Sequence, residues 1–463
     1  MKLHSEPIEE HDEVPLADEG RWEAAVAHWR SRETPQRAIG EQGNACYVLS
    51  LFKPEDEPSA NAQLEEIVGL VEAQGDRVVA KRSHVLIHPD PRTLIRRGLA
   101  ADVGDEAKEL GADLLVVDAD LNPSQARNLE DATGLAVSDR EAVILNVFER
   151  NARTRRARVQ VEIAHLEYLR PRIRGIGLNM DQQAGGLMAA RGPGETASEL
   201  LARRLDGRLA ELRRRLIILQ RSETAQRKGR DRCARVVLVG YTNAGKTSLM
   251  NALTSSELSA RDRPFETLDS TARALSRHGK DVVLSDTVGF IRRLPDRLLA
   301  SFESTLAEVR EASLILVVVD VSDPEAKAHL ETTERVLERL GAAAIARHIL
   351  FNKADRLDEP ADPRVLRLWA GEHNYSVVSS REPHLVAGLR ETILAAARSK
   401  QRTKQIYVPY EHAELQKAIH ARCRVVRSVA APGGMQYDVQ AEKHELDALF
   451  ASLRATRAEK DRR

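Results

Sequence analysis

Short apolar runs and helical stretches alternate along the chain after residue 42. Three runs have the length of buried β-strands, namely residues 46–52, 84–88 and 114–118. Between them, two stretches have the character of helices, residues 62–73 and 99–110. Strands and helices in alternation predict a small α/β domain with a largely parallel sheet, which we assign to residues 43–150.

The hydrophobic pattern becomes helical from about residue 151. Val159, Ile163 and Leu166 recur at helical spacing and predict a first helix. A second helix carries leucines at steps of four and three, namely Leu201, Leu205, Leu209, Leu212, Leu216 and Leu219. This narrow apolar seam predicts a two-helix hairpin over residues 151–230. Residues 174–196 lie between the two helices and contain so many glycines that we expect a non-helical tip.

A second α/β pattern follows, and we assign it to a domain at residues 231–399. Its predicted strands are residues 236–239, 282–284, 314–320, 348–351 and 376–379. Residues 400–463 predict a small C-terminal α/β domain, with a hairpin turn at residues 432–435. The charged residues 1–42 predict a mostly disordered, acidic tail.

The overall charge balance conceals a basic segment. The 463 residues include 70 Lys plus Arg and 70 Asp plus Glu, so the formal net charge is zero. Residues 150–235 nevertheless contain 21 basic and 9 acidic side chains. Such an excess favours a polyanion such as nucleic acid. A solvated helix surface explains it equally well.

Cysteine and hydropathy patterns indicate an intracellular protein. Cys46, Cys233 and Cys423 lie far apart, form no metal-ligand pair, and read as reduced thiols. No apolar run approaches the roughly 18 residues that a membrane span needs. The acidic start of the chain is unlike a secretory signal. We therefore expect a cytoplasmic protein without a membrane span. As a separate expectation, we take it to be a monomer.

A phosphate-binding loop follows the first strand of the second domain. The motif GYTNAGKT fits G-x-x-x-x-G-K-[ST] and opens a helix that presents its N-terminus to phosphates. Its residues and the next are candidate nucleotide ligands: Gly240, Tyr241, Thr242, Asn243, Ala244, Gly245, Lys246, Thr247 and Ser248. Lys246 would supply a charge to the β- and γ-phosphates, and the Thr247 hydroxyl would ligate Mg²⁺.

Two further segments fit a γ-phosphate and magnesium site. The strand at residues 282–284 ends in DTVG, where Asp286 can hold Mg²⁺ through water and Gly289 can meet the γ-phosphate. Between this motif and the loop lies FETLDST. Thr267 is the candidate switch threonine, contacting γ-phosphate and Mg²⁺, and Phe265 is a candidate nucleotide contact. Residues 323–325 read as an ordinary turn and helix start.

The motif NKAD selects the base. Asp355 can accept two hydrogen bonds from guanine N1–H and the exocyclic amine, a donor pair that adenine lacks. Asn352 would brace the loop and the base, and Lys353 belongs to the same motif. Ser379 and Ser380, after a later strand, complete the candidate base site. Four motifs in order, each at a strand end, predict GTP binding.

Two residues affect the expected rate of hydrolysis. Phe290 stands where Ras-like GTPases place a glutamine that orients water, so we expect weak intrinsic hydrolysis completed by a partner. Lys246, Thr267 and Gly289 are the other candidate catalytic residues. Asn243 could help to bind K⁺ beside the phosphates, or it could simply tolerate an unusual backbone conformation.

These motifs resemble the HflX GTPases of the Obg–HflX superfamily over roughly residues 46–449. The resemblance rests on GYTNAGKT, FETLDST, SDTVGFIRRLP and NKAD, and upstream on NPSQARNLED and RGPGET. It implies an N-terminal α/β domain with a long helical hairpin, a P-loop G domain and a small C-terminal domain. This chain departs from the family pattern after RGPGET, where it reads ASELLARR, and at Ser380, where alanine is usual.

The resemblance also implies partners. Members of the family bind the large ribosomal subunit and its RNA, and some split stalled ribosomes. The hairpin loop would contact ribosomal RNA through Arg191, Gly192, Pro193, Gly194 and Glu195. Two other functions stay open from the sequence. One is a GTP-binding ribosome assembly or hibernation factor with little turnover, and the other is an ATP-dependent RNA-remodelling enzyme, which NKAD disfavours.

Overall fold

The structure is a computed structural model, and it divides the chain into two compact units at Val143 and Ile144. It describes residues 43–184, 197–227, 234–254, 265, 271–275, 282–287, 289–295, 297–298, 308–398, 402–441 and 449–450. The predicted acidic tail, the candidate ribosome-contacting residues 191–195 and Thr267 lie outside these ranges. None of the described helices is long and apolar enough to cross a membrane.

The first unit holds a four-stranded parallel sheet in the order β2-β1-β3-β4. Its strands are β1 (Ala45–Phe52), β2 (Arg77–Val85), β3 (Leu114–Asp118) and β4 (Ala136–Asp139). Its helical elements are the 3-10 turn η1 (Pro54–Ser59) and the helices α2 (Ala60–Ala73), α3 (Arg97–Glu109) and α4 (Pro123–Thr133). The predicted small parallel α/β fold is confirmed.

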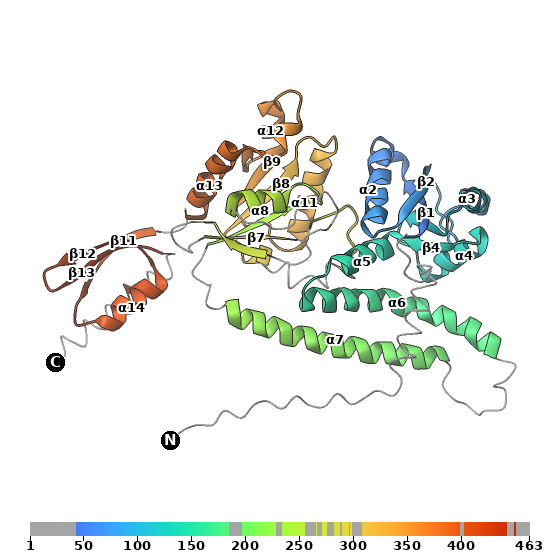
Figure 1. The fold of residues 1–463 in the computed structure, drawn as a ribbon, viewed down its shortest axis with the longest axis horizontal. Coiled ribbons are helices and arrows are strands. Elements are labelled where there is room, and N and C mark those ends of the chain that lie inside the picture. The colour runs from blue at the N-terminus through green and yellow to red at the C-terminus, as the bar shows by residue number, and fades with distance from the viewer. Residues whose placement is uncertain are drawn as a thin grey trace, which may run out of the picture. The chain divides into compact units, whose positions relative to one another are not determined.

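Alternation along β1 produces two apolar layers in this unit. Tyr47, Leu49 and Leu51 join a core that α3 and α4 also line. The other face of the sheet is covered by α2, which buries Ile67 and Leu70. Figure 1 shows the sheet with α2 on one side and α3 and α4 on the other. Successive side chains of a strand point to opposite faces, so a fully apolar strand requires helices on both.

A long helical hairpin lies in the second unit. The helix α5 (Arg140–Asn151), in which the first unit ends, leads to α6 (Arg155–Ala184), and α7 (Ala197–Arg227) packs against α6. Leu205, Leu209 and Leu212 are buried, which confirms the central part of the predicted leucine seam, and the outer leucines of the seam are half-buried. Three ion pairs cross between the helices: Arg170–Asp206 at 2.6 Å, Arg208–Glu162 at 2.9 Å and Arg213–Glu167 at 2.6 Å. Part of the basic excess of this segment is therefore balanced within the hairpin.

The prediction of a non-helical segment from residue 174 was wrong for its first part. The helix α6 continues to Ala184 and includes Gly175 and Gly177. A glycine inside a helix costs only about 1 kcal/mol relative to alanine, and the rest of a 30-residue helix can supply that. Residues 185–196, which include RGPGET, lie outside the described ranges.

The G domain is built on a six-stranded sheet in the order β10-β9-β8-β5-β7-β6. Its strands are β5 (Ala234–Gly240), β6 (Thr271–Ala274), β7 (Val282–Asp286), β8 (Leu314–Asp320), β9 (Arg347–Asn352) and β10 (Asn374–Val377). Only β6 among these runs antiparallel to its neighbour. The described helical elements are α8 (Lys246–Thr254), α11 (Ala326–Arg339), η3 (Ala354–Arg356), α12 (Pro363–Ala370) and α13 (Pro383–Arg398).

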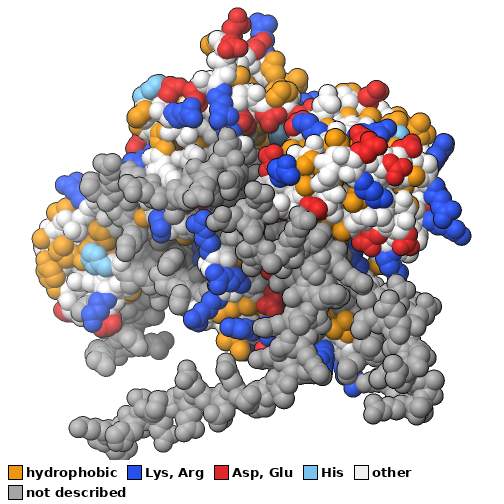
Figure 2. Space-filling view, turned by 45° about the vertical axis from the view of Figure 1, so that its right-hand side comes forward, with side chains coloured by type: hydrophobic (Ala, Val, Ile, Leu, Met, Phe, Trp, Pro, Cys, Tyr) orange, Lys and Arg blue, Asp and Glu red, His pale blue; other side chains and the backbone are white. Residues whose placement is uncertain are grey.

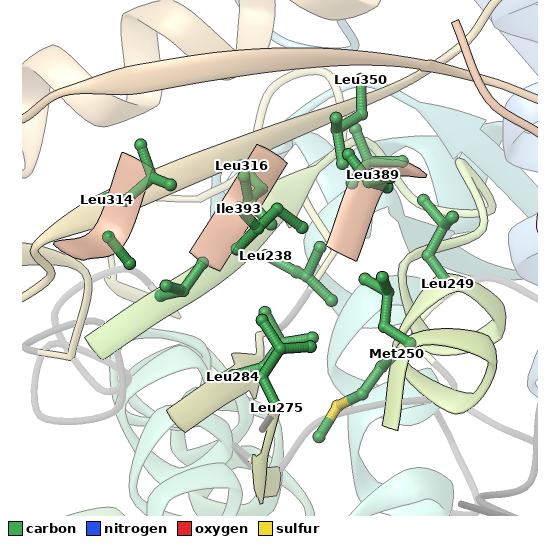
Figure 3. Close-up of a cluster of buried hydrophobic side chains, with 14 of the residues drawn as sticks. Leu238, Leu249, Met250, Leu275, Leu284, Leu314, Leu316, Leu350, Leu389 and Ile393 are labelled. Carbon is green, nitrogen blue, oxygen red and sulfur yellow. The ribbon is translucent and has the colours of Figure 1, made fainter. Parts of the chain in front are cut away.

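The main core of the G domain lies between this sheet and two helices. Leu249 and Met250 of α8, with Leu389 and Ile393 of α13, pack on Leu238 and other strand residues. These side chains point toward one another in Figure 3. The helix α11 packs on the opposite face, against β8 and β5 (Figure 1). The carboxyl ends of β5, β7, β8 and β9 therefore reach one edge of the sheet, where P-loop proteins bind nucleotides.

The C-terminal region forms a three-stranded antiparallel sheet in the order β11-β13-β12. The strands are β11 (Arg402–Pro409), β12 (Arg424–Ala431) and β13 (Gly434–Ala441), with the helix α14 (Ala413–Arg422). Ile406, Val408, Leu415, Ile419 and Val439 form its core. The predicted hairpin turn after residue 431 is confirmed. On the described part of the face that Figure 2 shows, acidic and basic side chains are interspersed.

Candidate nucleotide site

The glycines of the phosphate-binding loop stand where a side chain cannot fit. A Cβ at Gly240 would lie 2.2 Å from the carbonyl oxygen of Val318 in β8. At Gly245 the backbone has φ +89°, and a Cβ would lie 2.3 Å from Nδ2 of Asn352. The phosphate-binding loop is thus packed closely against the neighbouring strand β8 and against the loop that begins at Asn352. This close packing explains why the sequence requires glycine at both positions.

Lys246 is buried beneath this loop. Its Nζ donates hydrogen bonds to the carbonyl oxygens of Gly240 at 3.1 Å and Tyr241 at 2.8 Å. Burial lowers the pKa of Lys246 to about 8, although nearby Asp286 acts in the opposite direction. A buried ammonium held by carbonyl dipoles favours a negatively charged ligand in the adjacent loop. This arrangement fits a phosphate chain.

Thr247 and Asp286 meet at the start of α8. The Thr247 hydroxyl donates a hydrogen bond of 2.7 Å to Oδ2 of Asp286, which is fully buried at the end of β7. A hydroxyl and a carboxylate are hard oxygen donors of the kind that Mg²⁺ selects, usually together with substrate phosphates. The donor set therefore fits the magnesium ion that GTPases use. Thr267 would complete the set but lies outside the described residues.

The segment after Asp286 is bonded directly to the phosphate-binding loop. The Phe290 N–H donates to the carbonyl oxygen of Gly240 at 3.0 Å, and the Thr242 N–H donates to the carbonyl oxygen of Phe290 at 2.7 Å. The Phe290 side chain is buried. A Cβ at Gly289 would lie 3.1 Å from Nζ of Lys246. Gly289 therefore lies beside the phosphate loop, and Phe290 supplies an apolar side chain to the core.

The base-reading residues come together from two strands. The Asn352 side chain is buried and its Nδ2 donates to the carbonyl oxygen of Ala244 at 2.9 Å, which links the base loop to the phosphate loop. The Ser379 hydroxyl donates to Oδ1 of Asp355 at 2.7 Å. This hydrogen bond is the main cause that keeps the pKa of Asp355 below its usual value. A carboxylate held ionised suits the two N–H donors of guanine.

Two residues of the site have left-handed backbone conformations. Lys353 has φ +62°, and its Nζ lies 2.7 Å from Oδ2 of Asp320 at the end of β8. Asn243 has φ +60°. Asparagine is enriched in this conformation, so the backbone alone accounts for its presence in the loop. A role of Asn243 in K⁺ binding stays a prediction, as do the contacts of Ser248 and Ser380.

Phe265 has a neighbour that the sequence did not indicate. Its ring is buried and meets Phe148 of α5 edge to face, with centroids 4.5 Å apart.

Arg292, Glu325 and His329 were not identified from the sequence as residues near the site. They contact each other or Tyr241 across more than 30 positions of sequence, and no local pattern reports such contacts. The sequence offered only one hint of the Arg292–Glu325 contact, namely that the two residues carry opposite charges.

Comparison with known proteins supplies the family. A family model described as 50S ribosome-binding GTPase matches residues 235–353, and models of a GTP-binding GTPase N-terminal and middle region match residues 61–149 and 151–230. The GTPase HflX of Gluconacetobacter diazotrophicus is 42% identical over 74% of this chain and 75% of its own length. The chain belongs to the HflX family.

Other HflX proteins align over still more of their length. The GTPase HflX of Spirochaeta thermophila is 40% identical, covering 80% of this chain and 90% of that protein. The GTPase HflX of Escherichia coli is 34% identical, covering 71% of this chain and 76% of that protein. HflX membership confirms the predicted fold class and the enzyme class, a GTPase that converts GTP to GDP and phosphate.

Proposed function

We propose that this HflX-family chain is a ribosome-associated GTPase that binds the large ribosomal subunit and acts in rescue or splitting of stalled ribosomes. The observation that carries the proposal is the assembled nucleotide site: Lys246 beneath the phosphate loop, Thr247 on Asp286, and Ser379 on Asp355. The family model over this domain is described as a 50S ribosome-binding GTPase, which supports the partner. Such a protein would act in the cytoplasm, where ribosomes work.

The chain's own residues would bind GTP and hold it for attack by water. Lys246 neutralises phosphate charge, Asp355 orients the guanine, and the N–H of Gly289 meets the γ-phosphate. Mg²⁺, held near Thr247, Asp286 and Thr267, would supply further charge neutralisation on the phosphates. K⁺ near Asn243 is a second candidate cation, and equal turnover in K⁺ and Na⁺ buffers would remove it.

Phe290 supports a slow intrinsic rate. Its side chain is buried and carries no hydrogen-bonding group, so the position that orients water in Ras-like GTPases cannot do so here. Groups supplied by a partner can accelerate such sites by about 10³–10⁵. The large ribosomal subunit is the partner we propose. If it supplies none, the chain would act as a GTP-binding assembly or hibernation factor with little turnover.

The decisive experiment is GTP hydrolysis by the full chain in K⁺ buffer, with and without purified large ribosomal subunits. Stimulation by orders of magnitude supports a ribosome-activated GTPase. Tight GTP binding without stimulation favours the assembly or hibernation factor. Competition of GDP and ADP for the same site tests the ATP-dependent alternative, because Asp355 should exclude adenine.

Ribosome binding itself can be tested on the hairpin. Arg214 and Arg215 are exposed on α7, so we expect Arg214→Ala with Arg215→Ala to weaken binding to the large subunit and reduce its salt dependence. The matched control removes Arg96 and Arg97, an exposed pair at the start of α3. Equal loss in both double variants would argue against the hairpin as the RNA-binding element.

A further inference from the structure

Tyr241, the second residue of the phosphate-binding loop, directs its side chain to a helix outside the loop. Its ring stacks on the imidazole of His329 in α11, with centroids 3.7 Å apart and an interplanar angle of 14°. Its hydroxyl accepts a hydrogen bond of 2.9 Å from the backbone N–H of Arg292. Tyr241 therefore connects three segments: the phosphate loop, the segment after Gly289, and α11.

Arg292 makes a second connection to the same helix. Its guanidinium donates to Oε2 of Glu325 at 2.6 Å, immediately before the first residue of α11. Both side chains are mostly buried, at 16% and 24% exposed. The Glu325 N–H in turn donates to Asp323, whose carboxylate lies 3.6 Å from Nδ1 of His329. An ion pair withdrawn from solvent is screened little by salt.

The helix α11 can serve as a fixed support for these contacts. It buries Ala326, Leu330, Val336 and Leu337 and packs on β5 and β8. The segment from Gly289 to Arg292 has no such helix of its own. It is held by the Phe290 backbone bonds to the phosphate loop, by the buried side chains of Phe290 and Ile291, and by contacts of Arg292 that include the two described above. Losing the contacts of Arg292 with Tyr241 and Glu325 therefore removes restraints from the end of the segment farthest from the loop.

We propose that Tyr241, Arg292 and Glu325 form a latch that positions Gly289 for the γ-phosphate. Gly289 and Arg292 are three positions apart, a span of at most about 11 Å, so a shift of Arg292 has only two residues through which to reach Gly289. With the latch closed, Gly289 lies beside Lys246, as the structure shows. With the latch open, Gly289 spends less time there. Tyr241, Arg292 and Glu325 are positioning residues, because their side chains act through the segment after Gly289 and through α11.

The latch should distinguish GTP from GDP. The apparent affinity of a ligand falls in proportion to the population of the conformation that binds it. GTP contacts Gly289 through its γ-phosphate, whereas GDP has no γ-phosphate and is indifferent to the segment. Opening the latch should therefore weaken GTP binding selectively. The inference rests on the proposed GTP site, and GDP binding reports on that site separately.

The test measures binding of fluorescent GDP and of a fluorescent imido analogue of GTP to the full chain with Mg²⁺. For Arg292→Ala and for Glu325→Ala we expect the preference for the analogue over GDP to fall about tenfold, a typical coupling between a ligand and a conformational element. Affinity for GDP should stay unchanged. The double variant should be no worse than either single one, since both remove the same ion pair. Exchanging the charges, Arg292→Glu with Glu325→Arg, should restore part of the preference.

Two further variants keep the test decisive. Tyr241→Phe removes the acceptor for the Arg292 N–H and keeps the ring. It should therefore lower the preference for the GTP analogue over GDP less than Arg292→Ala does. It replaces Arg292→Ala in the test if circular dichroism shows that Arg292→Ala does not fold. Lys327→Ala, which removes an exposed charge from α11, should change nothing. Equal loss for GDP and analogue, or no loss, would overturn the latch. Failure of the unaltered chain to bind GDP would instead overturn the proposed site, and the latch with it.

Discussion

The hydroxyl of Thr247 and the carboxylate of Asp286 are joined by a hydrogen bond of 2.7 Å. They come from the start of α8 and the end of β7, 39 residues apart in sequence. Since the sheet places the end of β7 beside the phosphate loop, this contact is a consequence of the strand order β8-β5-β7. It brings together the two described residues that fit a magnesium ion.

Asp286→Asn should weaken the magnesium dependence of nucleotide binding. Asp286 is predicted to hold the ion through water, and loss of an outer partner of this kind typically costs about 10–100-fold in metal affinity. Titration of Mg²⁺ against binding of a GTP analogue measures the change. Thr247→Ser, which keeps the hydroxyl, is the control and should behave like the unaltered chain. Identical Mg²⁺ titrations for Asp286→Asn and the unaltered chain would remove Asp286 from the site.

Lys246 should make nucleotide affinity depend on pH above about 8. Burial places its pKa near that value in the free protein, and bound phosphates must raise it. Binding at pH 8.5 then takes up a proton, so affinity for GDP falls as the pH rises. Calorimetric titration in two buffers of different ionisation enthalpy measures this uptake. An observed enthalpy that does not depend on the buffer would contradict it.

The same lysine should make the stability of the free protein rise with pH, whereas nucleotide affinity falls with pH. Its pKa is lowered in the folded state, so the unfolded chain binds more protons between about pH 8 and 10.5. This group's contribution to the free energy of unfolding therefore rises with pH in that window. Comparison of thermal unfolding with that of Lys246→Met isolates the contribution, because other groups titrate equally in both proteins. Parallel pH profiles would rule it out.

Gly240→Ala should destabilise the G domain and abolish tight nucleotide binding. A Cβ would lie 2.2 Å from a backbone oxygen of β8, which cannot turn aside as a side chain could. Strain of this kind costs about 1–3 kcal/mol, which thermal unfolding would detect. Gly388→Ala in α13 is the matched control, since nothing lies within 4 Å of its Cβ position. There we expect a gain of about 0.5–1 kcal/mol.

The buried parts of the fold were the most predictable from sequence. The strands Leu114–Asp118 and Leu314–Asp320 were predicted with the boundaries observed, because a strand covered on both faces is a continuous apolar run. The motif residues of the candidate site were predictable for a related reason. A loop that wraps phosphates needs glycine at fixed positions, and that requirement is local in sequence.

Edge strands were predicted poorly. The strand expected at residues 84–88 is observed as Arg77–Val85, and β10 begins two residues before the predicted residue 376. Both lie at a sheet edge, where half-exposed side chains dilute the apolar pattern. The four-residue strand β4 was missed altogether. The contact between Arg292 and Glu325 could not be predicted, because it depends on how α11 packs on the sheet. From the sequence, residues 323–325 were interpreted only as an ordinary turn and helix start.

Asp355→Asn should exchange the base preference of the site. The carboxylate is positioned by Ser379 and suits the two N–H donors of guanine. An amide keeps one acceptor and presents a donor, which suits a base with a carbonyl at position 2, as in xanthine. A bound base would withdraw this side chain from water, and a polar group left unpaired there is costly, so sites of this kind discriminate by about 10⁴–10⁵. We expect GDP affinity to fall steeply and xanthosine diphosphate to bind better than GDP.

Ser379→Ala provides the control for this exchange. It removes the hydroxyl that donates to Oδ1 of Asp355 but leaves the carboxylate, so guanine should still be preferred. The loss of one hydrogen bond to a charged group costs about 1.5–3 kcal/mol, or roughly 10–150-fold in GDP affinity. Direct competition among the diphosphates of guanosine, xanthosine and adenosine measures both variants. If Asp355→Asn kept its preference for guanine, the base would have to be read by other residues, and the assignment of Asn352 to Asp355 as the base loop would be wrong.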